Sequence, residues 1–169
     1  MNISLRKASF ADVPALEVLI DASVRGLQKD DYNPAQIDSA LRTVFTVDSQ
    51  LIQDGTYFIA ERDGEIVGCG GDHHAVRDNV LLDPKCDPAK IRSIFVDPRH
   101  ARKGIGSMIL KTAEDAAIAE GFSQLEMAST LSGVPLYLLR GYRVVERSHV
   151  PLESGVSLPV IRMAKAILS

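Results

Sequence analysis

The stretch IFVDPRHARKGIGSMIL, residues 94–110, decides the fold because it runs from a strand through a tight turn into a helix. Its apolar start is halted at Pro98, which lacks a backbone donor and disfavours the α conformation in the residue before it. Two glycines follow, and apolar residues then recur at helical spacing. These features predict a strand at 90–98 and a helix at 103–120, joined by a basic glycine turn.

The glycine turn has the features of an anion site. Gly104 and Gly106 lie where the first turn of a helix leaves backbone N–H groups without partners inside the helix. Glycine permits a ligand to approach the backbone closely, and the helix dipole favours phosphate there. Arg102 and Lys103 would add positive charge. The spacing fits neither a Walker loop nor a dinucleotide fingerprint, so a solvated basic turn is the alternative interpretation.

The rest of the chain alternates between strand and helix patterns. Two apolar alternating runs flank Asp63–Gly64, a favoured tight-turn dipeptide, and predict a hairpin. Residues 75–89 lack periodicity and are predicted to form a loop. The mixed order predicts an α/β fold whose sheet is partly antiparallel and partly parallel. Further strands are predicted at 3–8, 56–62, 65–74, 122–130, 142–150 and 157–167, and helices at about 9–24, 34–41, 48–55 and 132–141.

Composition and charge limit the class of protein. The 169 residues are 46% hydrophobic and 24% charged, as expected for one globular domain spanning 1–169. Apolar runs fall far short of the ~20 residues of a membrane helix, and the N-terminus lacks signal-peptide features, so we expect a cytoplasmic protein. The net charge of -3 argues against nucleic-acid binding and leaves room for a small cationic substrate. Cys69 and Cys86 show no paired spacing and are expected to be reduced, without a functional role.

The stretch 94–110 resembles motif A of the GCN5-related N-acetyltransferase (GNAT) family, which binds the pyrophosphate and pantetheine of acetyl-CoA. The family pattern is Gln/Arg-x-x-Gly-x-Gly/Ala. Gly104 and Gly106 match its two glycines, whereas Ala101 stands at the Gln/Arg position. This departure affects one side chain, because the pyrophosphate is held mainly by backbone amides and Arg102 could supply the charge.

A second stretch, PLYLLRGYRV at 135–144, resembles motif B of the same family, Phe-Tyr-x-x-x-Gly-Phe/Tyr. Tyr137 lies four residues before Gly141, and Leu136 replaces the usual aromatic residue. The resemblance covers nearly the whole chain. It implies a mixed central sheet of about six to seven strands with helices on both faces, in which two parallel strands splay apart to form the acetyl-CoA cleft.

The resemblance implies direct transfer of the acetyl group from acetyl-CoA to an amine, without a metal. Backbone amides near a bulge at 94–96 would polarise the acetyl carbonyl. Tyr137 would protonate the departing thiolate as general acid; its alternative role is packing. The residues implied in acetyl-CoA binding are Ile94, Phe95, Val96, Arg102, Lys103, Gly104, Ile105, Gly106, Ser107 and Thr130.

The acceptor side of the site is less defined by sequence. His73 and His74 are candidate general bases, although adjacent strand residues face opposite sides and only one of them could point into the site. A solvated strand end is the alternative. Tyr32 and Asp72 are candidate acceptor contacts, and the histidine pair lacks further ligands for a metal.

Three functions therefore remain open from sequence. The first is an N-acetyltransferase that modifies a small amine or a protein amino group. The second is a non-catalytic acyl-CoA sensor of the same fold, and the third is a phosphate or nucleotide binder that lacks acetyl transfer. Homodimers are common in the resembled family, but no surface stripe in this sequence predicts one.

Overall fold

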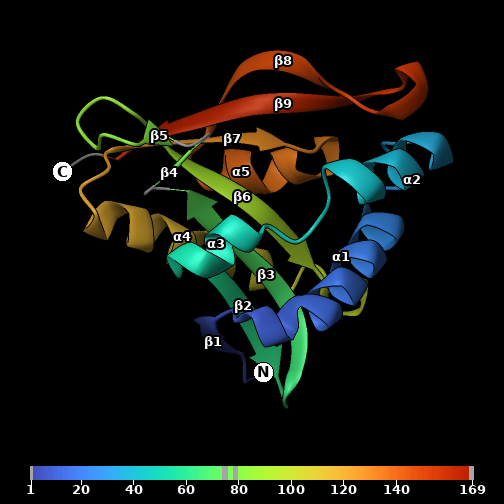
Figure 1. Cartoon of the computed structure of the whole chain (residues 1–169), viewed down its shortest axis with the longest axis horizontal. Helices are drawn as coiled ribbons and strands as arrows, with labels where there is room; N and C mark the ends of the chain where they lie inside the picture. The colour runs from blue at the N-terminus through green and yellow to red at the C-terminus, as the bar shows by residue number, and fades with distance from the viewer. Residues whose placement is uncertain (1, 74–75, 78–79, 168–169) are drawn as a thin grey trace.

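The computed structural model describes residues 2–73, 76–77 and 80–167, and its main feature is a seven-stranded mixed sheet with helices on both faces (Figure 1). The strand order is β1-β2-β3-β6-β7-β9-β8. This architecture confirms the predicted fold class. The strands are β1 (Ser4–Lys7), β2 (Tyr57–Arg62), β3 (Glu65–His73), β6 (Ala89–Val96), β7 (Gln124–Ser129), β8 (Arg143–Pro151) and β9 (Ser157–Ala166).

Two groups of helices cover the two faces of the sheet (Figure 1). One face carries α1 (Val13–Leu27), α2 (Pro34–Thr43) and α3 (Ser49–Asp54); the other carries α4 (Ile105–Ala119) and α5 (Val134–Leu139). Short 3-10 turns join several elements: η1 (Phe10–Asp12), η2 (Pro98–His100), η3 (Leu131–Gly133) and η4 (Glu153–Gly155). Within the described ranges, no helix is both long and apolar enough to span a bilayer.

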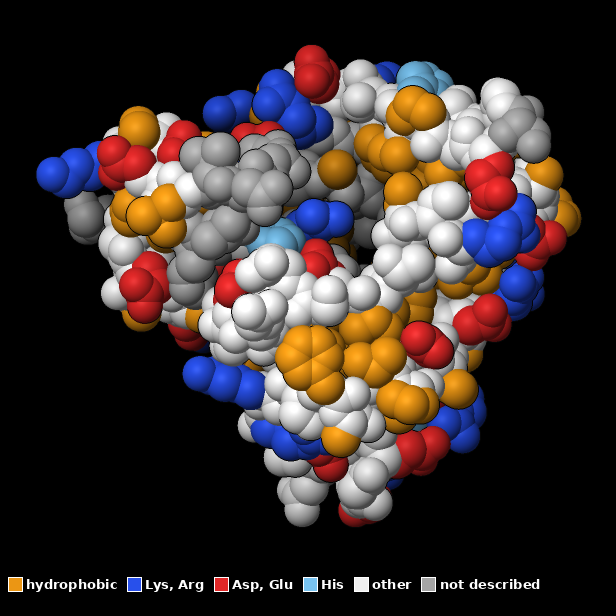
Figure 2. Space-filling view, in the orientation of Figure 1, with side chains coloured by type: hydrophobic (Ala, Val, Ile, Leu, Met, Phe, Trp, Pro, Cys, Tyr) orange, Lys and Arg blue, Asp and Glu red, His pale blue; other side chains and the backbone are white. Residues whose placement is uncertain are grey.

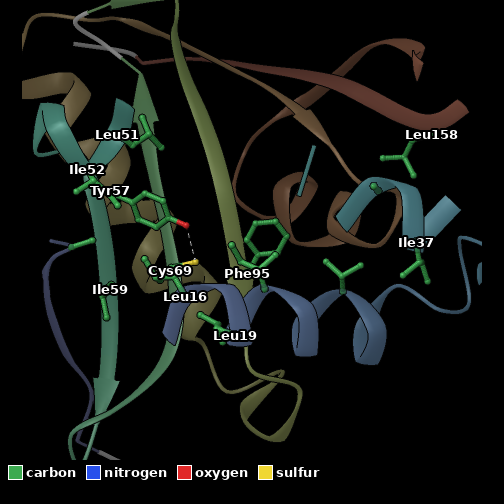
Figure 3. Close-up of a cluster of buried hydrophobic side chains, with 14 of the residues drawn as sticks. Leu16, Leu19, Ile37, Leu51, Ile52, Tyr57, Ile59, Cys69, Phe95 and Leu158 are labelled. Atoms are coloured by element: carbon green, nitrogen blue, oxygen red, sulfur yellow. Dashed lines mark hydrogen bonds between the residues drawn. The ribbon is translucent and has the colours of Figure 1, made fainter. Parts of the chain in front are cut away.

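Each face has its own apolar core. Figure 3 shows the cluster under α1, where Leu16 meets Tyr57 and Phe95. The opposite cluster brings Leu110 of α4 together with Tyr137 of α5 and the sheet. Burying a leucine-sized side chain contributes about 1.5–3 kcal/mol, so both faces of the sheet contribute to holding the strands in place.

Local signals in the sequence set several element ends. The Asn33 side chain accepts from the Gln36 amide at 2.8 Å, and Pro34 opens α2, as predicted. Asp63 and Gly64 both have positive φ, at 52° and 79°, which is the geometry of the predicted hairpin turn. These residues therefore specify local structure independently of the core.

The structure differs from prediction between β3 and β6. Within the predicted loop at 75–89, β4 (Val76–Arg77) pairs antiparallel with β5 (Val80–Leu81) in a separate ribbon. Strands of two residues are too short to produce a readable alternation, so the prediction of a plain loop was wrong there. The first helix also continues to Leu27, one turn beyond its predicted end.

Two irregularities of β6 position the site. β6 pairs in parallel with β7 only through Ala89 and Lys90, and the two strands then diverge (Figure 1). On its other side, the β3 ladder shifts register so that Ser93 and Ile94 lie opposite Gly70, and Ser93 has a φ of 61°. A Cβ on Gly70 would lie 2.7 Å from a side-chain carbon of Ile94, so only glycine fits opposite this bulge.

Candidate active site

A cleft of about 430 Å³ opens where β6 and β7 diverge. Figure 2 shows a hollow on this face, with basic, acidic and apolar side chains around it. Apolar side chains from the α2–α3 connection and from β9 form part of its wall, including Phe45 and Val160. Three of the predicted cofactor-binding residues and the predicted acid line it, namely Ile94, Phe95, Thr130 and Tyr137.

The glycine turn presents free backbone donors to the surface. Gly104 is the N-cap of α4 with a φ of 84°, and Arg102 also has positive φ. Among the described residues, no hydrogen-bond acceptor is found for the backbone N–H groups of 102–107. A Cβ on Gly104 would meet no atom within 4 Å, so the turn borders open space. These features fit a pyrophosphate group.

Several basic side chains lie near this turn. The Arg140 Nε donates to the Ser107 hydroxyl at 3.0 Å, which brings a guanidinium from the end of α5 to the first turn of α4. Arg102 and Lys103 are exposed. Arg99, by contrast, is engaged by Asp97 and by Glu65.

The bulge in β6 is supported from behind by a buried thiol. The Cys69 thiol donates to the Ser93 carbonyl at 3.5 Å and lies 3.4 Å from the Tyr57 hydroxyl (Figure 3). Burial raises the pKa of the Cys69 thiol to about 12, so it stays neutral and unreactive at physiological pH. Cys86 is exposed, and both cysteines are free.

The Val96 amide, one of the three predicted at the bulge, already has a hydrogen-bond partner. The Val96 N–H donates to the Ser23 hydroxyl of α1 at 3.2 Å, and Val96 does not line the cleft. A ligand that uses this amide would therefore have to replace the Ser23 hydroxyl.

Tyr137 lines the cleft, and its ring also packs against Tyr142. Burial raises the pKa of its phenol well above the usual value. Its ring packs edge-to-face on Tyr142, with centroids 5.9 Å apart, and the Tyr142 hydroxyl donates to Glu114 at 2.7 Å. In the described part of the chain, nothing hydrogen-bonds the Tyr137 hydroxyl.

The predicted acceptor-side residues are not brought together in the cleft. His73 is buried and does not line the cleft, and its Nε2 lies 3.0 Å from Asp48 Oδ2. Asp72 is fully buried in β3, and the Tyr32 hydroxyl donates to the Pro159 carbonyl at 2.7 Å. Neither Asp72 nor Tyr32 lines the cleft, and His74 lies outside the described residues.

Sequence reasoning missed a set of charged residues on the cleft floor. Lys90 Nζ lies 2.6 Å from Glu126 Oε1, and Arg162 Nη1 lies 3.3 Å from the same oxygen. Burial alone would raise the pKa of Glu126, but hydrogen bonds and charge from Lys90 and Arg162 outweigh it and lower that pKa. Each residue alternates with apolar neighbours in its strand, and this alternation was the available signal.

Comparisons with known proteins agree on the architecture. A model of the acetyltransferase (GNAT) family matches residues 22–142. The solved structure of a GCN5-related N-acetyltransferase from Rhodopseudomonas palustris has a TM-score of 0.80 at 22% identity, covering 99% of this chain and 97% of that one. A comparison with curated proteins gives no match.

Two further solved structures show the same fold at lower identity. The paia N-acetyltransferase from Thermoplasma acidophilum, in complex with coenzyme A, has a TM-score of 0.73 at 17% identity, covering 98% of this chain and 99% of that one. The ribosomal-protein-S18-alanine N-acetyltransferase from Escherichia coli has a TM-score of 0.65 at 17% identity, covering 99% and 96%.

Proposed function

Since the chain belongs to the GNAT family of acetyltransferases, we propose that it transfers the acetyl group of acetyl-CoA directly to an amine, with Tyr137 as general acid. The observation that carries the proposal is the divergence of β6 and β7 beside a bulged strand, with the tyrosine on the cleft wall. The acceptor is a small amine or an amino group of a protein.

The glycine turn is proposed to hold the pyrophosphate of acetyl-CoA. The N–H groups of 102–107 would donate to it, and Arg102, Lys103 and Arg140 would add charge. This arrangement does not need the Gln or Arg that Ala101 replaces. The Ile94 and Phe95 backbone would hold the acetyl end, where N–H donors stabilise the negative charge that develops on the carbonyl oxygen.

The reaction needs two proton movements. The amine nitrogen forms a bond to the acetyl carbon, the carbon–sulfur bond breaks, and the thiolate receives a proton from Tyr137. A raised pKa suits this role because the phenol still carries its proton at neutral pH. The amine must also lose a proton, and His73 or His74 is proposed to take it through water. Asp48 would orient the His73 ring.

Two measurements test the proposal. Calorimetric titration with acetyl-CoA should show specific binding. A separate titration with inorganic phosphate alone should show no such binding. Thiol release should then depend on an added amine, measured over amino acids, peptides, polyamines and aminoglycosides. Tight acetyl-CoA binding without turnover on any amine would favour the sensor function instead. Absence of acetyl-CoA binding would leave only the phosphate binder.

A further inference from the structure

The cleft lining has an excess of positive charge. Lys90, Arg92 and Arg162 line it, and Glu126 is the one acidic residue among its described lining residues. Lys90 and Arg162 are both engaged by Glu126, and Arg162 Nε also lies 3.1 Å from Glu146. Of these three cations, Arg92 has the most distant acidic partner, because its Nη1 lies 3.8 Å from Asp48 Oδ2.

Arg92 has hydrogen-bond donors to spare. Among the described residues, it forms an ion pair with Asp48 at 3.8 Å, a distance beyond that of a hydrogen bond. That carboxylate already accepts from His73 Nε2 at 3.0 Å and from the Gln50 amide at 3.1 Å. Within the described ranges, the Arg92 guanidinium makes no hydrogen bond, and its side chain is 54% exposed. A guanidinium placed in this way presents a planar fork that matches a carboxylate.

The position of Arg92 separates it from the phosphates of acetyl-CoA. Arg92 directly precedes the bulge at Ser93 and Ile94, whereas the glycine turn follows the C-terminal end of β6. The four residue steps from Arg92 to Val96 span up to roughly 13 Å in an extended strand. In the proposed binding mode, the pyrophosphate lies beyond that distance, and the acetyl carbonyl lies next to Arg92. An anion bound by Arg92 would therefore belong to the acceptor.

We propose that Arg92 binds a carboxylate of the acceptor, so that the substrate is a small amine of the amino-acid class. Its guanidinium would hold the carboxylate through paired N–H···O bonds, with the amino group directed toward the bulge. This inference rests on the proposed acetyltransferase function. It also disfavours polyamines, because the lining around the acceptor carries net positive charge.

The test compares acceptors that differ only in the carboxylate. The twenty L-amino acids, their carboxamides and spermidine are measured by thiol release, and by calorimetric titration into protein saturated with coenzyme A. At least one amino acid should bind and react at least about tenfold better than its carboxamide. Arg92→Gln should remove that preference, because it should weaken binding and reaction of the amino acid but not of the carboxamide. Arg92→Lys should retain part of the preference.

Arg147→Gln is the matched control, because Arg147 is an exposed arginine on β8 that does not line the cleft. It should leave the preference intact. Three results would overturn the inference. The amino acids and their carboxamides could bind equally well, spermidine could bind or react better than any amino acid, or Arg92→Gln could weaken the amino acid and the carboxamide to the same extent. If amine-dependent thiol release is retained in such a result, the acetyltransferase function still stands. If acetyl-CoA fails to bind, the acetyltransferase function fails first.

Discussion

Lys90 and Glu126 are partners twice: they are paired in the short parallel ladder between β6 and β7, and their charged atoms lie 2.6 Å apart. The ion pair therefore sits at the closed end of the cleft, at the last point where the two strands are joined. Beyond it the strands separate, and the space between them becomes available to a ligand. The charge pair thus fixes the point from which the cleft opens.

Replacing Glu126 should make folding stability less dependent on pH. The folded-state pKa of Glu126 is depressed, so its stabilisation is present above the ordinary carboxyl pKa and is lost as pH falls through the folded value. Glu126→Gln should lower the free energy of unfolding by about 1 kcal/mol at pH 7 and by less near pH 3. Urea unfolding across this range measures the difference.

Asp115→Asn is the control for this change, since the Lys111–Asp115 pair has a similar distance of 2.8 Å but is exposed. Solvent screens such pairs, and little effect is expected at any pH. If Glu126→Gln lowers the free energy of unfolding by the same amount at pH 3 and pH 7, the charge of Glu126 does not stabilise the fold.

Gly104→Ala should weaken acetyl-CoA binding by about tenfold or more. A side chain at this position would project into the open space beside the free amides, and the φ of 84° would be strained. Calorimetry measures the affinity. Gly155→Ala carries the same kind of strain at φ 74°, also with no atom near the added carbon, but lies in the β8–β9 connection. It should leave the affinity unchanged; an equal loss in both variants would point to general destabilisation.

Tyr137→Phe should lower kcat by about tenfold to a hundredfold while acetyl-CoA affinity stays close to wild type. Because burial raises the pKa of Tyr137, the phenol should remain an acid throughout the usual assay range, without causing a loss of kcat below about pH 10. Tyr142→Phe removes a neighbouring hydroxyl that is bound to Glu114, and should reduce stability but not kcat. Unchanged kcat in Tyr137→Phe would exclude it as the acid.

Gly71→Ala should destabilise the fold by about 2 kcal/mol or more, because the added carbon would lie 2.0 Å from the Thr56 carbonyl oxygen. The neighbour is backbone and cannot move aside without disturbing the β2–β3 ladder. Thermal and urea unfolding would measure the loss. An unfolding free energy equal to wild type would mean that β2 and β3 can separate at this position at little cost.

Local signals predicted the elements of this fold better than they predicted the acceptor site. The glycine turn, the Asp63–Gly64 hairpin and the α2 cap were readable because each is encoded within a few consecutive residues. The cleft floor was not, because Lys90, Glu126 and Arg162 belong to three strands that meet only in the sheet. Strand alternation indicates that such residues share a face, but it does not reveal which charges become partners.

The support behind the bulge gives the protein an internal reporter of motion. Cys69 is fully buried beneath Ser93, so a thiol reagent can reach it only when β3 and β6 separate locally, whereas Cys86 is exposed from the start. The delay between modification of the two thiols therefore measures how often β6, the strand proposed to hold the acetyl group, separates from β3. Acetyl-CoA bound along that strand should lengthen the delay, and the native sequence needs no added label to show it.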